Sequence, residues 1–165
     1  MKQLALLLIS TLSYVVQVQA QPVKSATSNE LIEKLAVPYA NTRSLAARNL
    51  EPQPRSLDLV IQFEFDSAKL KSESKPLLDN LSTALKSDRL KSIQFKVEGH
   101  TDAKGTEAYN QALSLKRANA VVEYMTQQGI EAERLKAEGK GFAELLMPEK
   151  PLAMENRRVR ISTTQ

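Results

Sequence analysis

Residues 93–129 read IQFKVEGHTDAKGTEAYNQALSLKRANAVVEYMTQQG, and this stretch indicates the architecture of the chain most clearly. From Ile93 to Val97 apolar residues alternate with polar ones, which is typical of a half-buried β-strand. A polar loop follows, and a helix is predicted from about 106 to 128, where Gly129 ends it. The stretch therefore predicts a strand, a loop and a long helix in direct succession.

Upstream of this unit, two further apolar patterns predict one strand and one helix. The run from Leu57 to Phe65 alternates apolar and polar residues almost without interruption, so it predicts a second half-buried strand. An apolar stripe at helical spacing follows, with Pro76 in its first turn and Ser72 or Ser74 as the opening residue.

Downstream of the long helix, weaker signals complete the domain. A short turn at 131–134 leads to a strand near 135–140, and Val159 and Ile161 mark a last strand. The predicted order is β-α-β-α-β-β. Because strand–helix–strand crossovers are almost always right-handed, both main helices are expected on one face of a mixed sheet. The predicted fold class is α+β, a two-layer sandwich over residues 57–165.

Residues 1–20 have the pattern of a secretory signal peptide. Lys2 supplies a positive charge, residues 4–9 are an unbroken apolar run, and Val18-Gln19-Ala20 places small residues where signal peptidase cleaves. A retained membrane helix is the alternative, but polar residues interrupt a run that is short for a bilayer. Cleavage after Ala20 leaves residues 21–165, with no second apolar stretch long enough to span a membrane.

Residues 21–56 are expected to be a leader that precedes the domain. They hold four of the seven prolines and no glycine, which is typical of an extended linker. One short helix is compatible with the apolar spacing from Leu31 to Leu35 and with a capping box formed by Thr27 and Glu30. A flexible spacer and a helix that docks on an envelope protein both remain open for this segment.

The composition excludes several classes of protein. The chain has no cysteine and one histidine, which rules out thiolate metal sites, disulfides and zinc sites built on several histidines. It has no tryptophan and a net charge of only +4, which argues against a nucleic-acid partner. No metal and no cofactor are expected.

The loop between the predicted strand and the long helix carries the candidate ligand-binding residues. Asp102 lies in the loop, where free backbone N–H groups precede a helix. Asn110, Ser114 and Arg117 are spaced four and three apart, so they share one helix face. A pocket with Asp102 and Arg117 would suit a zwitterion, although a capping aspartate and a solvated arginine are equally compatible with the spacing.

A set of motifs in this order resembles the OmpA-like peptidoglycan-binding family. The resemblance runs from about Leu57 to Ile161 and implies an α+β sandwich that binds cell-wall peptidoglycan noncovalently in the periplasm. The motifs are Phe63-Glu64-Phe65-Asp66-Ser67 with Lys69-Leu70, Gly99-His100-Thr101-Asp102, Gly105-Thr106, Tyr109-Asn110, Leu113-Ser114, Arg117-Ala118 with Val121, and Asn156-Arg157-Arg158-Val159.

The resemblance also implies roles for individual residues. Asp102 matches the acid that pairs with the ammonium group of meso-diaminopimelate in the stem peptide, and Arg117 matches the arginine that pairs with its carboxylate. A planar guanidinium suits a carboxylate in two parallel hydrogen bonds. The remaining matches are Asn110 and Leu113, which line the pocket, and Phe65, Asp66, Thr101 and Ala103, which edge it.

The function implied is peptidoglycan binding that anchors or organises the cell envelope, in the periplasm and in association with the outer membrane or wall. An enzyme is not expected, because no nucleophile with a base and no pair of facing carboxylates is evident. A periplasmic adaptor that uses the same fold to bind proteins is the alternative.

Several residues near the motifs have a structural interpretation. His100 is expected to be a structural histidine, and Asn156 a turn residue. Of the neighbours Arg157 and Arg158, one is expected on the pocket side and the other in solvent, because adjacent strand residues face opposite sides. Residues 141–148 depart from the family's usual Gly-Glu-x-x-Pro spacing, which affects the outer rim of the pocket.

Overall fold

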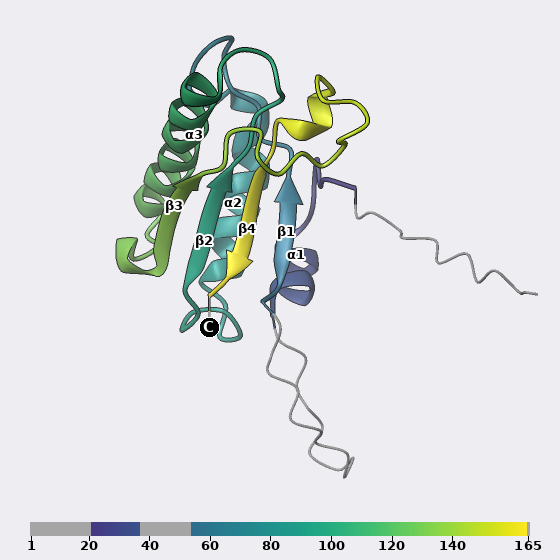
Figure 1. The fold of residues 1–165 in the computed structure, drawn as a ribbon. Helices are drawn as coiled ribbons and strands as arrows, with labels where there is room; N and C mark the ends of the chain where they lie inside the picture. The colour runs from purple at the N-terminus through teal and green to yellow at the C-terminus, as the bar shows by residue number, and fades with distance from the viewer. Residues whose placement is uncertain (1–20, 37–53, 165) are drawn as a thin grey trace, which may run out of the picture.

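The computed structural model describes residues 21–36 and 54–164, and its centre is a four-stranded mixed sheet (Figure 1). β4 lies between β1 and β2 and is antiparallel to both, whereas β3 pairs with β2 in parallel. The predicted mixed sheet is confirmed. Its strands are β1 (Ser56–Leu59), β2 (Phe95–Gly99), β3 (Leu135–Gly139) and β4 (Val159–Thr163), in the order β1-β4-β2-β3.

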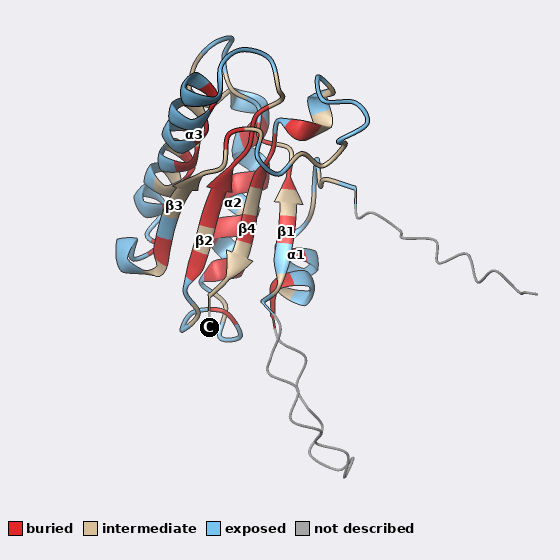
Figure 2. Cartoon of the chain, viewed as in Figure 1, coloured by how far each residue is buried: buried red, intermediate tan, exposed pale blue. Residues whose placement is uncertain are grey.

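The helices α1 (Ser28–Leu35), α2 (Lys75–Leu85) and α3 (Glu107–Gln127) lie behind the sheet in the view of Figure 1. Figure 2 shows buried residues along the strands and on the faces of the helices that turn toward them. The apolar stripe of α2 is part of this core, together with Val97 and Ile161 of the sheet. The two main helices therefore share one face, as predicted.

The helix ends follow their sequence signals. α2 begins just after a short 3₁₀ turn, η1 (Ser72–Ser74), and carries Pro76 in its first turn. α3 begins after Thr106, whose side chain accepts a hydrogen bond from the backbone N–H of Tyr109. It is followed by Gly129, whose φ of 88° lies in the left-handed region that favours glycine.

The sheet face opposite the helices carries a row of charges across all four strands. Asp58, Arg160, Glu98 and Glu138 are in register on β1, β4, β2 and β3. Arg160 bonds to Asp58, and Lys140 lies 3.2 Å from Glu98. Glu98 is therefore engaged in an ion pair on the sheet face opposite the helices, and it alternates with Val97, which is buried on the helix side.

The first strand is shorter than the alternation predicted. It ends at Leu59, and the chain from Gln62 folds back on residues 69–71. The backbone N–H of Glu64 donates to the carbonyl of Lys69, and that of Lys71 donates to the carbonyl of Gln62. Asp66, at the tip of this turn, has a φ of 51°. The alternation continues through this turn because a hairpin arm has the same period as a strand, so the pattern alone does not reveal where pairing ends.

Residues 21–36 lie on the domain, which differs from the leader that the composition predicted. The predicted capping box of Thr27 and Glu30 is confirmed, and α1 buries Leu31 and Leu35 completely. Val23 pairs with the edge of β1 through hydrogen bonds to the backbone of Asp58 and Val60. The composition did not indicate this packing, because two leucines suffice to cover the end of the core. Residues 37–53 and the predicted signal peptide lie outside the described residues.

Across the described ranges, no helix has the length and apolar character needed to cross a membrane.

Candidate functional site

The loop between β2 and α3 is fixed by backbone hydrogen bonds to the segment before β4. The N–H groups of Thr101 and Ala103 donate to the carbonyl groups of Gly141 and Pro151, at 2.8 and 3.0 Å. Gly99 lets the loop and helix approach so closely because a Cβ there would collide with the carbonyl of Ser114 on α3. The position of Asp102 is therefore determined by the packing of the helix on the sheet.

Asp102 is oriented by two hydrogen bonds. One carboxylate oxygen accepts the backbone N–H of Lys104 at 3.1 Å, and the other accepts from the Arg157 guanidinium at 2.7 Å. The Asp102 side chain is 15% exposed and that of Arg157 is 45% exposed. The carboxylate thus faces a basic group at the edge of the pocket, and Arg157 is the arginine of the Arg157–Arg158 pair that lies on the pocket side.

Arg117 enters the same region from α3. Its Nε donates to the carbonyl of Ser67 at 3.1 Å, and its guanidinium carbon lies 5.0 Å from the centre of the Phe63 ring. Burial lowers the pKa of Arg117 and the charge of Arg157 lowers it further, whereas Asp102 and Asp66 oppose both effects. No described carboxylate forms an ion pair with Arg117, although two lie close enough to influence it.

A shallow hollow of about 370 Å³ lies beside Arg117, between α3 and the turn at 66–68. Leu113 and Asp66 line it, and the Tyr109 hydroxyl donates a hydrogen bond to the Asp66 carboxylate. Phe65 is 95% exposed at the neighbouring turn. An aromatic ring in water next to a charged hollow is a typical contact for a ligand; Tyr109 was not among the predicted site residues, although its place one turn before Leu113 on the helix would have indicated it.

Three of the predicted site residues have supporting positions. Asn110 is buried, and its amide donates to the backbone carbonyls of Lys104 and Thr106 at 2.8 and 3.1 Å. Thr101 is 3% exposed, and Ala103 is half-buried beside Asp102. Asn110 therefore holds the loop that carries Asp102, and its amide is occupied in this state.

Other residues flagged in the sequence have structural roles. His100 is buried, and burial together with the charges of Arg158 and Arg160 lowers its pKa to about 3. Asn156 is buried and bonds to the backbone of Met147 and Lys150, as expected of a turn residue. One arginine of the pair was expected in solvent. With Arg157 on the pocket side, Arg158 is instead 2% exposed, because its guanidinium pairs at 2.7 Å with Asp58, which lies on the sheet face opposite the helices.

The described part of the chain contains no group of three or more His, Cys, Asp or Glu side chains arranged to hold a metal ion. The fold and the pocket together define a small α+β binding domain, with acidic and basic side chains gathered where the loop after β2 meets α3. The chain belongs to the OmpA family, whose family model matches residues 62–159.

Curated relatives match more than half of the chain. Outer membrane protein A of Serratia marcescens is 40% identical over 95 residues, which cover 58% of this chain and 26% of the relative. Outer membrane porin F of Pseudomonas aeruginosa is 42% identical over 86 residues, which cover 52% and 24%. The chain thus spans about a quarter of the length of these relatives.

Solved structures have the same fold. The peptidoglycan-associated lipoprotein from Burkholderia pseudomallei is 26% identical, with a TM-score of 0.54 over 78% of this chain and 98% of that one. The cell wall anchor of the T6SS from Pseudomonas aeruginosa is 28% identical, with a TM-score of 0.55 over 68% and 82%. The α+β sandwich implied by the sequence is confirmed.

Proposed function

We propose that this domain binds cell-wall peptidoglycan noncovalently, through the meso-diaminopimelate residue of the stem peptide, and so anchors or organises the envelope from the periplasm. The family membership supports this, as do two structural relatives, a peptidoglycan-associated lipoprotein and a cell wall anchor. The relatives named as outer membrane proteins support an envelope location.

The observation that most supports the proposal is the environment of the Arg117 guanidinium. Its guanidinium is half-buried and stacked on Phe63, yet it has no carboxylate partner among the described residues. A buried charge without a counterion is costly, so a ligand carboxylate that satisfies it gains both Coulomb attraction and two aligned hydrogen bonds.

Asp102 supplies the complementary charge for the ammonium group. The side chain of diaminopimelate ends in an amine and a carboxylate on one carbon, so the two protein charges need to face one small volume. Asp102 and Arg117 are close enough for the carboxylate to influence the pKa of the guanidinium. The ammonium would share the Asp102 carboxylate with Arg157, which holds one of its oxygens in the absence of ligand.

Co-sedimentation with purified sacculi tests the proposal. Removing one member of a desolvated charge pair costs about 2–5 kcal/mol, which is roughly 30-fold or more in affinity. We therefore expect Asp102→Ala and Arg117→Ala to abolish co-sedimentation. Arg117→Lys keeps the charge but loses the planar fork, so it should weaken binding without the cavity that alanine leaves beside Phe63.

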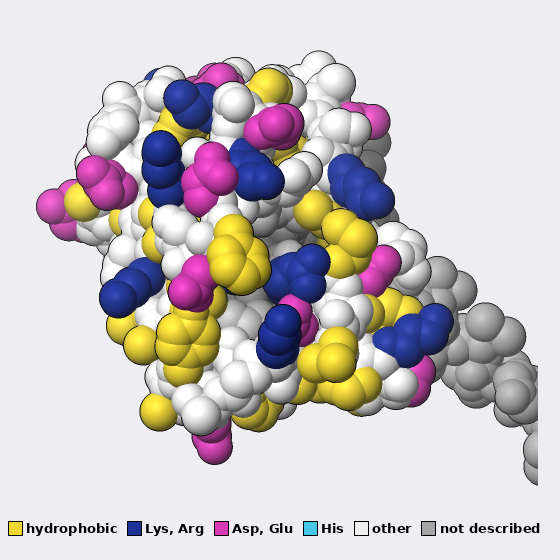
Figure 3. Space-filling model, turned by 90° about the horizontal axis from the view of Figure 1, so that it is seen from above, with side chains coloured by type: hydrophobic (Ala, Val, Ile, Leu, Met, Phe, Trp, Pro, Cys, Tyr) yellow, Lys and Arg dark blue, Asp and Glu magenta, His cyan; other side chains and the backbone are white. Residues whose placement is uncertain are grey.

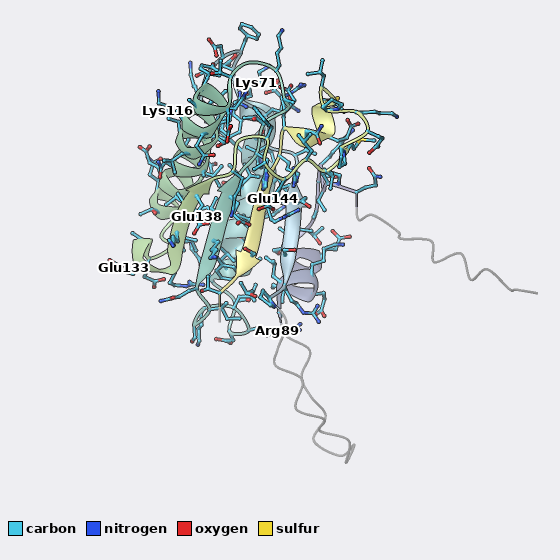
Figure 4. The ribbon with its side chains drawn as sticks, viewed as in Figure 1. Lys71, Arg89, Lys116, Glu133, Glu138 and Glu144 are labelled. Carbon is cyan, nitrogen blue, oxygen red and sulfur yellow. The ribbon has the colours of Figure 1, made fainter. Side chains whose placement is uncertain are left out.

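Arg89→Ala and Asp88→Ala are the matched controls, because they remove the same charges from exposed positions at the other end of the molecule (Figure 4). Both should bind sacculi like the unmodified chain. If Asp102→Ala and Arg117→Ala also bind normally, the peptidoglycan proposal is wrong and an adaptor that binds proteins becomes the better account.

A further inference from the structure

A second cavity is lined by Arg117 but not by Leu113. Its volume is about 250 Å³, and it is bounded by the chain after β1, by the end of β2 and by the segment that leads into β4. Ile61 and Phe63 form an apolar wall, while Gln62 and Met154 are exposed at its rim. Figure 3 looks onto this end of the molecule and shows a hollow with Lys and Arg side chains around it.

The charges around this cavity are basic. Lys71, Arg117 and Arg157 line it together with the buried Arg158, and no acidic residue does. The Lys71 ammonium forms no hydrogen bond or ion pair within the described ranges, and its side chain lies at the same end of the molecule as the loops around the pocket (Figure 4). Arg158 pairs with Asp58 and Arg157 with Asp102, so among the cationic groups of this cavity Lys71 is the one that neither an acidic partner in the described ranges nor the diaminopimelate carboxylate engages.

A buried polar group also lines the cavity without a partner. His100 is 1% exposed, and neither ring nitrogen has a hydrogen-bond partner among the described residues. A buried side chain of this kind normally has a partner, so its unsatisfied nitrogens are available to a polar group placed beside it in the cavity. With a pKa of about 3 the ring is neutral, and one of its nitrogens can donate a hydrogen bond.

We propose that this cavity is a second anion subsite, which takes the terminal carboxylate of the alanine that follows diaminopimelate in an uncrosslinked stem peptide. The proposal rests on the proposed function and extends it by one residue of ligand. The apolar wall of Ile61 and Phe63 suits the alanine methyl group, and Lys71 and Arg157 suit the carboxylate. Arg117 lines this cavity and also donates a hydrogen bond to the carbonyl of Ser67, which lines the hollow next to Leu113.

The size of the cavity supports a single small residue. A volume near 250 Å³ accommodates an alanine with its carboxylate and a few waters, but no sugar–peptide unit. The alanine is joined to the main-chain carboxyl of diaminopimelate, so the diaminopimelate side chain and one peptide unit separate its terminal carboxylate from the carboxylate held by Arg117. Extended, this stretch is about as long as three residues, roughly 10 Å, which lets the ligand reach from Arg117 into the cavity that Arg117 also lines.

Calorimetric titration of the full chain tests this subsite with four probes. The probes are free meso-diaminopimelate, a stem tetrapeptide with a terminal acid, the same tetrapeptide with a terminal amide, and a tetrapeptide in which only the glutamate carboxylate is amidated. A hydrogen bond between charged partners is worth enough that its loss weakens binding by about tenfold. We expect that loss for the terminal amide and not for the amidated glutamate.

Lys71→Met tests the residue that the sequence analysis did not consider. It should bind the tetrapeptide acid about tenfold more weakly, show little further loss with the terminal amide, and bind free diaminopimelate normally. Lys75→Met removes an exposed lysine four residues away that does not line the cavity, so it is the matched control and should behave like the unmodified chain.

The outcomes separate the two proposals. Equal binding of the acid and the terminal amide, with free diaminopimelate still bound, overturns the subsite and leaves the proposed function intact. A loss on amidation of the glutamate alone overturns the assignment to the terminal carboxylate, and normal binding of the acid by Lys71→Met overturns the role of Lys71. If the unmodified chain binds none of the four probes, the proposed function itself is wrong.

Discussion

His100 shows how burial turns one residue into a source of pH dependence. It is the only histidine in the sequence, and its pKa falls from 6.5 to about 3 because it is buried beside Arg158 and Arg160. His100 of the unfolded chain therefore takes up a proton near pH 6.5, whereas His100 of the folded chain stays neutral at that pH. Stability is complete above that pH and declines as the pH falls toward the folded pKa.

The size of this effect follows from the unfolded pKa. Between pH 7 and pH 5 the free energy of unfolding should fall by about 2 kcal/mol, since few other groups titrate in that window. Urea denaturation at the two pH values measures it. His100→Gln should show a flatter dependence, and an equal decline in both proteins would locate the effect elsewhere.

Asp58 neutralises the most deeply buried charge of the domain. It lies 2.7 Å from Arg158, whose side chain is 1% exposed, and 3.1 Å from Arg160. Replacing it with alanine leaves Arg158 buried without its counterion, which typically costs about 3–5 kcal/mol. We expect Asp58→Ala to lower the free energy of unfolding by that amount.

Chemical denaturation measures the loss, with Asp88→Ala as the control. Asp88 pairs with Lys91 in the open, at 94% exposure, so solvent screens the pair and its loss should change the free energy of unfolding little. A similar small loss for both variants would mean that Arg158 finds another partner, such as Glu144, whose backbone carbonyl it already contacts.

The sequence predicted the candidate pocket unevenly, residue by residue. The strand–loop–helix pattern allowed Asp102 and Arg117 to line one pocket, and the family resemblance, rather than the spacing, singled them out. The ion pair between Asp102 and Arg157 was not, because it joins residues 55 positions apart through a loop of unusual spacing. Likewise, Lys71 reaches the cavity beside Arg117 only because the chain reverses direction at Asp66. The alternation of apolar and polar residues does not reveal that reversal.

α3 and its connections were the most predictable elements. Thr106 before the helix and Gly129 after it indicate the same boundaries, and the structure has the helix at Glu107–Gln127. α1 was harder to assign, since a helix of eight residues is not stable alone and forms because α2 and the edge of β1 accept it.

α1 is therefore expected to contribute to stability. Leu35 is completely buried, and truncating a buried leucine to alanine costs about 2–5 kcal/mol. We expect Leu35→Ala to lower the free energy of unfolding by this amount while leaving sacculus binding unchanged, because α1 does not contribute to the pocket. Thermal unfolding measures the stability. Co-sedimentation at about 20–25 °C measures the binding.

Lys34→Ala, at an exposed position of the same helix, is the control and should change stability by no more than about 0.5 kcal/mol. A stability loss in neither variant would return residues 21–36 to the role of a leader. A loss of binding in Leu35→Ala at a temperature where it is folded would instead show that α1 influences the site.

For the molecule as a whole, the layer arrangement was predictable and the extent of the packed unit was not. Binary patterns and the handedness of crossovers determine that two helices cover one face of the sheet. They contain no information on whether a preceding segment, separated by residues 37–53, returns to cover the edge of the core, because that depends on surface left open in the finished fold. The predicted cleavage after Ala20 stays a prediction.

The pocket also predicts which kind of cell wall the molecule recognises. Arg117, Asp102 and Arg157 come together from α3, the loop after β2 and the segment before β4. Lysine-type stem peptides keep the side-chain amine that Asp102 would bind, but they lack the carboxylate that Arg117 would bind. A site built for a polar group discriminates strongly against an analogue without it, since its own group is left unpaired.

We expect a clear preference for diaminopimelate-type over lysine-type muropeptides, and a decrease of affinity as salt screens the solvent-exposed part of the pocket. Calorimetry with the two muropeptides at matched ionic strength measures the preference, and equal affinities would show that Arg117 does not recognise that carboxylate.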